Sequence, residues 1–114
     1  MLVRKFSEGE SYTQECGPNC EFRTILKRGE VGDMGAGVIK MKGPTWNKLA
    51  SHDKWHQFYI ILKGKGTMQI GEEKIPVTAP SVVMIPFNTM HALQLAENEE
   101  VEYVYVNQFL KDTV

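Results

Sequence analysis

The sequence predicts an all-β protein built as a barrel or a sandwich. From residue 20 onward, short runs rich in β-branched and aromatic residues alternate with glycine, proline and other turn residues at regular spacing. No segment shows convincing helical periodicity, with residues 109–114 as the one candidate for a short helix. We therefore expect strands to build the core.

Each predicted strand is a β-rich run bounded by turn residues. Residues 57–63, QFYIILK, are typical, because they are too apolar for a loop and too few for an ordinary helix. In chain order the predicted strands are Glu21–Lys27, Gly35–Met41, Gln57–Lys63, Gly66–Ile70, Lys74–Val77, Ser81–Ile85, His91–Leu95 and Glu102–Gln108.

Length and charge narrow the class of protein. A chain of 114 residues can close one hydrophobic core but not two, so a single domain, 1–114, is expected. The 13 Lys and Arg residues nearly balance the 14 Asp and Glu residues, which disfavours a nucleic-acid or membrane-surface partner. No apolar run approaches the roughly 20 residues of a membrane span, and the first residues lack a secretory signal. We therefore expect a cytoplasmic location.

The two cysteines, Cys16 and Cys20, flank a Gly-Pro-Asn turn that brings their thiols near each other. A metal site would need two more sulfur or imidazole ligands. A disulfide is an alternative, although disulfides are unusual in a reducing cytosol. The favoured interpretation is a pair of reduced thiols on an N-terminal hairpin.

The three histidines fall in two segments, Ser51–Gly66 and Ile85–His91. His52 and His56 lie at the start of the strand predicted over 57–63, and His91 follows a turn that begins at Pro86. If the two segments are neighbours in a barrel, that turn brings a third imidazole to the same place. This end of the barrel is the candidate site.

At these residues the chain resembles the cupins, small jelly-roll β-barrels with two signature segments. The first segment reads G-x5-H-x-H-x3-4-E-x6-G, and Gly64 matches its closing glycine. On that alignment Gln57 stands where the family has glutamate, His52 matches the second histidine, and Ala50 replaces the first.

The second cupin segment reads G-x5-P-x-G-x2-H-x3-N. Pro86 and His91 match its proline and histidine, whereas Pro80, Asn88 and Leu95 replace two glycines and the asparagine. Asn88 is a mild departure, because asparagine tolerates the left-handed conformation. The resemblance covers residues 35–107 and implies a cupin-type jelly-roll core, preceded by N-terminal strands and an arm in residues 1–34.

The resemblance implies that His52, Gln57 and His91 converge as ligands of a divalent metal ion. Imidazole nitrogen suits Zn, Ni or Fe, whereas an uncharged amide in place of the carboxylate disfavours Mg and Ca. The alternative is a barrel mouth in which His52 and His91 hydrogen-bond to each other or to Gln57 through water, without an ion.

Two further residues are candidates for chemistry at this site. Tyr59 shares the face of Gln57 by strand alternation, so it is the expected pocket residue that orients a ligand oxygen or donates a proton. His56 is expected to point out of the barrel, because neighbouring side chains on a strand face opposite sides. A bulge at the start of the strand would turn it inward. It could then carry a proton, or replace the family histidine that is missing at Ala50. Asp53, in a turn, is a weaker candidate.

Two functions remain open. The first is a metal-dependent enzyme, of isomerase, lyase or dioxygenase type, acting on a small sugar-like or carboxylate-like molecule. The second is a ligand-binding or sensor cupin without a metal or a reaction. The lack of a glutamate at position 57 weakens the case for a metal-dependent enzyme. The retained His52 and His91 weaken the case for a cupin without a metal.

A homodimer is also expected. The runs VEYVYVNQF and FYIIL are apolar on both faces, yet a barrel of this size has only one interior. A second copy meeting the first about a two-fold axis is the simplest cover for the outer face.

Overall fold

The computed structural model describes residues 3–12, 19–46 and 49–111. In these residues the chain is almost entirely β-structure, as predicted, and it contains no α-helix. In chain order the elements are η1 (Phe6–Glu8), β1 (Glu10–Tyr12), β2 (Cys20–Leu26), β3 (Met34–Lys42), β4 (Thr45–Trp46), β5 (Trp55–Ile70), β6 (Glu73–Thr78), β7 (Ser81–Ile85), β8 (His91–Leu95) and β9 (Glu100–Phe109).

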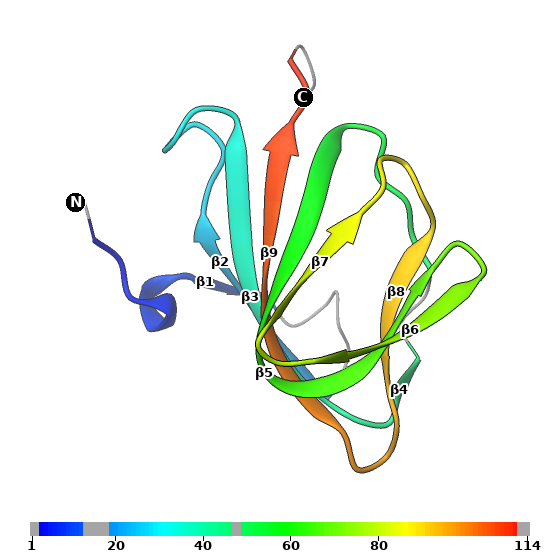
Figure 1. Cartoon of the computed structure of the whole chain (residues 1–114). Coiled ribbons are helices and arrows are strands. Elements are labelled where there is room, and N and C mark those ends of the chain that lie inside the picture. The colour runs from blue at the N-terminus through cyan, green and yellow to red at the C-terminus, as the bar shows by residue number, and fades with distance from the viewer. Residues whose placement is uncertain (1–2, 13–18, 47–48, 112–114) are drawn as a thin grey trace.

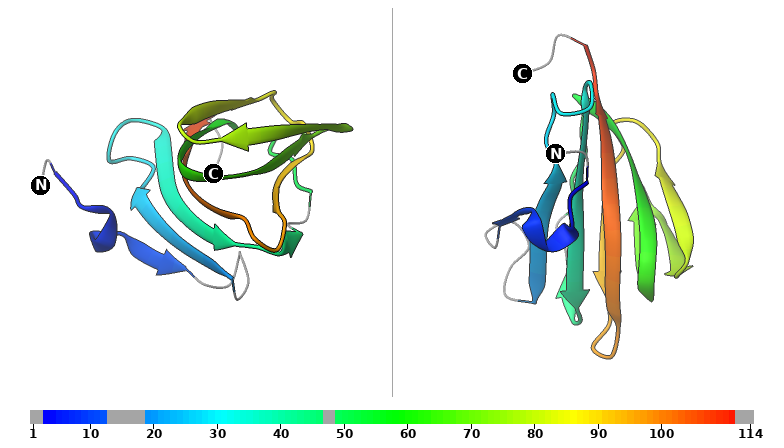
Figure 2. Two further views of the ribbon diagram at one scale, coloured as in Figure 1. Left: turned by 60° about the horizontal axis from the view of Figure 1, so that its bottom comes forward. Right: turned by 90° about the vertical axis from the view of Figure 1, so that its left-hand side faces the viewer.

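The strands form two walls that share β5 (Figure 1). The first half of β5 pairs with β9 on one side and with β7 on the other, and β9 leads on to β3, β2 and β1. The second half of β5 pairs with β6 and β8, and β8 pairs with the short β4. The views in Figure 2 show the two walls curving around one interior, with the N-terminal segment outside it.

One strand replaces two predicted ones, because Gly64–Gly66 does not form a hairpin turn. β5 runs without a break through these residues and passes there from one wall of the barrel to the other. Gly64 has φ +84°, and a Cβ atom at this position would overlap the carbonyl oxygen of Glu100. The pairing with β9 also shifts register between Ile61 and Lys63. A bulge and a left-handed glycine therefore bend a continuous strand, where the sequence alone indicates a turn.

Other expectations were only partly correct. β1 and β4 are absent from the eight predicted strand ranges, although N-terminal strands were expected in residues 1–34 and β1 pairs there with β2. Phe109 ends β9, so the candidate helix over 109–114 is wrong at its first residue, and residues 112–114 lie outside the described part. Cys20 is disulfide-bonded, which contradicts a reduced thiol there, while Cys16 lies outside the described residues. Among the described residues, no helix has the length and apolar character that a membrane crossing requires.

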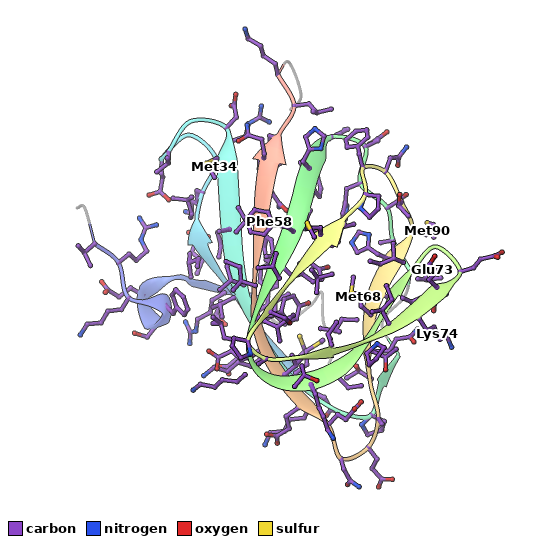
Figure 3. The ribbon with its side chains drawn as sticks, in the orientation of Figure 1. Met34, Phe58, Met68, Glu73, Lys74 and Met90 are labelled. Atoms are coloured by element: carbon purple, nitrogen blue, oxygen red, sulfur yellow. The ribbon has the colours of Figure 1, made fainter. Side chains whose placement is uncertain are left out.

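The core fills the space between the two walls and leaves the polar site residues at its end. Ile61 and Met68, on the two halves of β5, have no exposed surface, and Met68 points into the interior in Figure 3. Burying an aliphatic side chain of this size contributes about 1.5–3 kcal/mol. The buried core consists of Met41, Tyr59, Ile61, Met68, Val77, Val83, Leu93, Leu95, Val101 and Tyr103.

Candidate functional site

A small cavity lies among residues near the start of β5, the end of β7 and the start of β8. Figure 1 shows these three strand ends on the same side of the barrel. The volume of the cavity is about 10 Å³, close to the minimum that one water molecule needs. The cavity can therefore hold one water, one ion or a single ligand atom. It is lined by His52, Trp55, Gln57, Ile85, Pro86, Phe87, Asn88, Thr89 and His91.

The structure brings the three expected ligands to this one cavity. Gln57 points inward from the start of β5, and the buried His91 is the first residue of β8. The turn between β7 and β8 contains Asn88 at φ 51°, the left-handed conformation for which asparagine is suited. His52 lies beside His91 with their ring centres 5.1 Å apart.

A β-bridge fixes the loop that carries His52. The backbone nitrogen of Ala50 donates to the carbonyl oxygen of His91 at 3.1 Å, and the nitrogen of His91 donates back to Ala50 at 2.9 Å. Residues paired in this way place their side chains on the same face of the ladder. The position that lacks the first family histidine is therefore directly beside His91.

The ring of His91 is oriented by its own turn. Its Nδ1 atom lies 2.8 Å from the carbonyl oxygen of Thr89, and a carbonyl oxygen only accepts hydrogen bonds. Nδ1 therefore carries a hydrogen, and in the neutral ring Nε2 presents a lone pair to the cavity. A backbone carbonyl fixing one ring nitrogen is the usual support of a metal-binding histidine.

The other ring nitrogen meets the side chain of Gln57. Nε2 of His91 lies 3.2 Å from Oε1 of Gln57, while Nε2 of Gln57 donates to Oδ1 of Asn107 at 2.8 Å. With His91 neutral, two lone pairs face each other across this gap. A proton on His91, a cation between the two atoms, or an exchange of nitrogen and oxygen in both amides would each relieve the repulsion.

Asn107 is a site residue that sequence reasoning missed. It stands opposite Gln57 in the β5–β9 ladder and is only 7% exposed. Its acceptor directs the nitrogen of Gln57 away from the cavity, so the oxygen of Gln57 faces His91. The signal in the sequence is a pair of amides, Asn107 and Gln108, near the end of the run VEYVYVNQF, and the sequence gives no partner for either.

His52 and Trp55 form the outer part of the cavity wall. Their rings stack with centres 4.5 Å apart. Burial, followed by the neighbouring His91, lowers the pKa of His52 from its ordinary value of 6.5. His52 is therefore neutral near pH 7, as a ligand must be. The Nε1–H of Trp55 is buried without a hydrogen-bond partner among the described residues, so this wall also holds a free donor.

The two residues expected to carry protons lie outside this cavity. The ring of Tyr59 packs 6.2 Å from the His91 ring and 4.7 Å from the ring of Tyr103. Burial, reinforced by Tyr105, raises the pKa of Tyr59 well above its ordinary value, so its hydroxyl stays protonated. His56 is exposed on the outer side of β5, as expected, with its ring 4.9 Å from that of Phe87.

Neither His56 nor Asp53 lines the cavity. Among the described residues, no three His, Cys, Asp or Glu side chains gather as a metal site would require. A metal ion at this place would therefore depend on the amide of Gln57. The ligand roles of His52, Gln57 and His91 remain a prediction.

A family model described as the cupin domain matches residues 38–107. The match covers most of the barrel, including Gln57 and His91. The chain is a cupin. Two motif positions that define the family's metal site nevertheless differ in this cupin, at Ala50 and Gln57.

Several solved structures share the fold of this cupin. A predicted oxalate decarboxylase from Thermotoga maritima has a TM-score of 0.83 at 18% identity, over 96% of this chain and 100% of that chain. The polyketide cyclase RemF from Streptomyces resistomycificus has a TM-score of 0.79 at 12% identity, over 94% of this chain and 78% of that chain.

The cupin domain of Cnp3 from Schizosaccharomyces pombe has a TM-score of 0.77 at 15% identity, over 96% of this chain and 74% of that chain. At such identities the likeness establishes the jelly-roll fold and leaves the activity open. None of the curated proteins matched the sequence.

Proposed function

We propose that this cupin binds a divalent metal ion between His52, Gln57 and His91 and, through it, a small carboxylate-like or sugar-like molecule. The observation that supports the proposal is the approach of His91 Nε2 to Gln57 Oε1, with the other side of each group already bonded to Thr89 and Asn107.

The spacing of these two atoms fits a shared ion. Zinc lies about 2.0–2.2 Å from nitrogen and oxygen ligands, so two ligand atoms on one ion stand roughly 3.0–3.4 Å apart at tetrahedral or octahedral angles. The separation between His91 Nε2 and Gln57 Oε1 is 3.2 Å. His52 supplies a second imidazole beside His91, and both rings line the cavity.

The ligand chemistry selects the kind of ion. Two neutral imidazoles and one amide favour Zn, Ni or Fe over Mg and Ca, which need charged oxygen ligands. Because no carboxylate contributes charge, the affinity should be moderate. When bound, the ion would act as a Lewis acid toward an oxygen of the small molecule.

The small cavity limits how the molecule can bind. The ion itself would fill the space of about 10 Å³, so the molecule would lie at the mouth, against Phe87 and Trp55, and would reach the ion with one donor atom. A carboxylate meets this limit, because one of its oxygens can reach the ion from the mouth, and one solved structure with this fold is described as a predicted oxalate decarboxylase.

Catalysis is the less well supported half of the proposal. An isomerase, lyase or dioxygenase needs a group that moves a proton. Tyr59 is buried and protonated, and the exposed His56 lies on the outer side of the wall. Binding of the small molecule without turnover, as in a sensor cupin, is therefore the second candidate.

A sensor cupin without metal also fits one arrangement of the amides. If both amide groups are turned over, Nε2 of Gln57 donates to Nε2 of His91, and Nδ2 of Asn107 donates to Oε1 of Gln57. Each of the two contacts then joins a donor to an acceptor. In that arrangement a water fills the cavity, and Nε2 of His91 is occupied by an amide hydrogen.

Titration of metal into tag-free protein tests the proposal. After treatment with a chelator, calorimetry with Zn²⁺ or Ni²⁺ should show one site per chain. His91→Ala should abolish binding, and His56→Ala, a matched change of the same residue type on the outer face, should leave it unchanged. An unaltered protein that takes up no metal, or equal losses in both variants, would overturn the metal site and favour the sensor cupin.

A further inference from the structure

The ring of His52 lacks the hydrogen bonds that orient its neighbour at the cavity. Both ring nitrogens of His91 are in contact with polar groups, one with Thr89 and the other with Gln57. No hydrogen bond joins the ring of His52 to any of the described residues. A metal-binding histidine normally has its second nitrogen fixed by a polar partner. Within the described part of the chain, another kind of contact must therefore orient His52.

The backbone anchors the loop that carries His52 but does not set the angle of the ring. The bridge between Ala50 and His91 holds the chain two residues earlier, and His52 itself lies outside the strands. The side-chain torsion that sets the plane of an imidazole is broad when no neighbour restricts it. The plane of the His52 ring therefore depends on what packs against it.

Ring stacking restricts that plane. The face of the His52 ring lies on Trp55, with ring centres 4.5 Å apart and planes 23° apart. The ring of His91 meets the ring of His52 nearly edge-on, at 5.1 Å and 63°. Turning the imidazole would break its face contact with the indole. Stacking does this without occupying either ring nitrogen, so one nitrogen stays available to the cavity.

The indole of Trp55 belongs to the wall of the barrel. Trp55 is the first residue of β5 and pairs with Phe109, the last residue of β9, and their ring centres are 5.3 Å apart. Figure 1 shows β9 ending beside the start of β5. The Phe109 ring lies over Gly35, where a Cβ atom would come within 3.1 Å of it, and the guanidinium of Arg28 lies 4.7 Å from its centre. The sheet therefore fixes the surface on which His52 stacks.

We propose that Trp55 is the positioning residue of His52, and that its indole face takes the place of the hydrogen bonds that orient His91. For the metal ion, this inference rests on the proposed function, because His52 acts there as a ligand. The orientation of the ring is a property of the chain without any ion. Phenylalanine at position 55 would present a similar flat face, whereas an aliphatic side chain would not.

Nuclear magnetic resonance of the metal-free protein tests the orientation. The imidazole protons of His52, assigned by their loss in His52→Gln, should be shifted upfield by the ring current of Trp55 and should show through-space contacts with the indole. Trp55→Phe should keep part of this shift, and Trp55→Leu should abolish it. Unchanged His52 resonances in Trp55→Leu would overturn the proposal. Trp55→Met fills more of the space without a flat ring, so it replaces Trp55→Leu if that variant does not fold.

Calorimetry with Zn²⁺ tests the consequence for the site. Trp55→Leu should weaken binding by about 10–100-fold, the usual effect of losing a group that orients a ligand, and Trp55→Phe should recover most of the affinity. Phe22→Leu is the matched control, because it breaks the stacked pair of Phe22 and Tyr105, 5.5 Å apart, and neither of these residues lines the cavity. Equal losses in Trp55→Leu and Trp55→Phe, or in Trp55→Leu and Phe22→Leu, would overturn the positioning role.

The two measurements separate this inference from the proposed function. If the unaltered chain binds no metal, the metal site is overturned, and the resonances of His52 still decide whether Trp55 orients the ring. If metal binding is equally strong in Trp55→Leu and in the unaltered chain, the role of Trp55 is overturned and the metal site stands.

Discussion

The Nε2 atom of His91 lies 3.2 Å from Oε1 of Gln57, although neither atom carries a hydrogen when the ring is neutral and the amide points as it does here. Two acceptors at hydrogen-bonding distance require a positive partner between them or a rearranged network. Whether that partner is an ion, a proton or an amide hydrogen is the question on which the function of this cupin depends.

Asn107→Leu should weaken metal binding without touching the ion. Loss of the acceptor at Oδ1 frees the amide of Gln57 to rotate, and losses of supporting partners typically cost about 10–100-fold in metal affinity. Asn107→Asp retains the acceptor and should bind metal at least as well as the unaltered chain.

Calorimetry on these variants, with Gln108→Leu as the control on the exposed neighbour, measures the effect. Asn107→Leu should also lower the free energy of unfolding by about 1–3 kcal/mol, because it leaves a buried polar group unpaired. Equal affinity in Asn107→Leu and Asn107→Asp would mean that the orientation of Gln57 does not matter.

Restoring the family pattern with Ala50→His and Gln57→Glu should tighten metal binding markedly. The backbone bridge between Ala50 and His91 places a side chain at position 50 beside the His91 ring, and glutamate adds the missing negative charge. Competition with a fluorescent chelator gives the affinities. A double variant that binds no metal at all would show that the motif alignment is wrong.

Stability should fall as the pH is lowered from about 6.5, and His52 should account for part of the fall. Burial lowers the pKa of folded His52 from its ordinary value of 6.5, so the unfolded chain takes up a proton that the folded chain resists. The contribution of His52 is thus present above pH 6.5 and is lost as the pH falls toward the lower, folded pKa.

Urea unfolding at several pH values measures this dependence. The slope of the unfolding free energy against pH should be smaller in His52→Gln than in the unaltered chain. His56→Gln is the control on the exposed face. An identical slope in His52→Gln would rule out a linkage through His52.

Gly64→Ala should destabilise the fold more than Gly71→Ala does. Both glycines have positive φ, +84° and +59°, but only at Gly64 would a Cβ atom overlap backbone, that of Glu100. The left-handed conformation alone costs about 1–2 kcal/mol for an alanine, and the overlap adds to this at the bend of β5. Urea midpoints of the two variants provide the comparison, and equal shifts would contradict this role for the bend.

Local pattern predicted much of the fold. β7 and β8 have the predicted bounds, because strand alternation and flanking turn residues are encoded within a few neighbouring positions. Alternation also predicted that His56 faces outward while Gln57 and Tyr59 face inward. The same rule failed at Gly64–Gly66, where a glycine pair that is typical of a turn bends one strand between two walls instead.

The tertiary structure decided what surrounds the site. Gln57 and Asn107 are 50 residues apart, and only the register between β5 and β9 makes them partners. The approach of the His52 ring to the His91 ring, with centres 5.1 Å apart, likewise depends on how two segments that are distant in the sequence pack together. The alternation of residues along a strand determines which face of the sheet a side chain lies on. Its hydrogen-bond partner on that face is determined by the register between strands that are distant in the sequence.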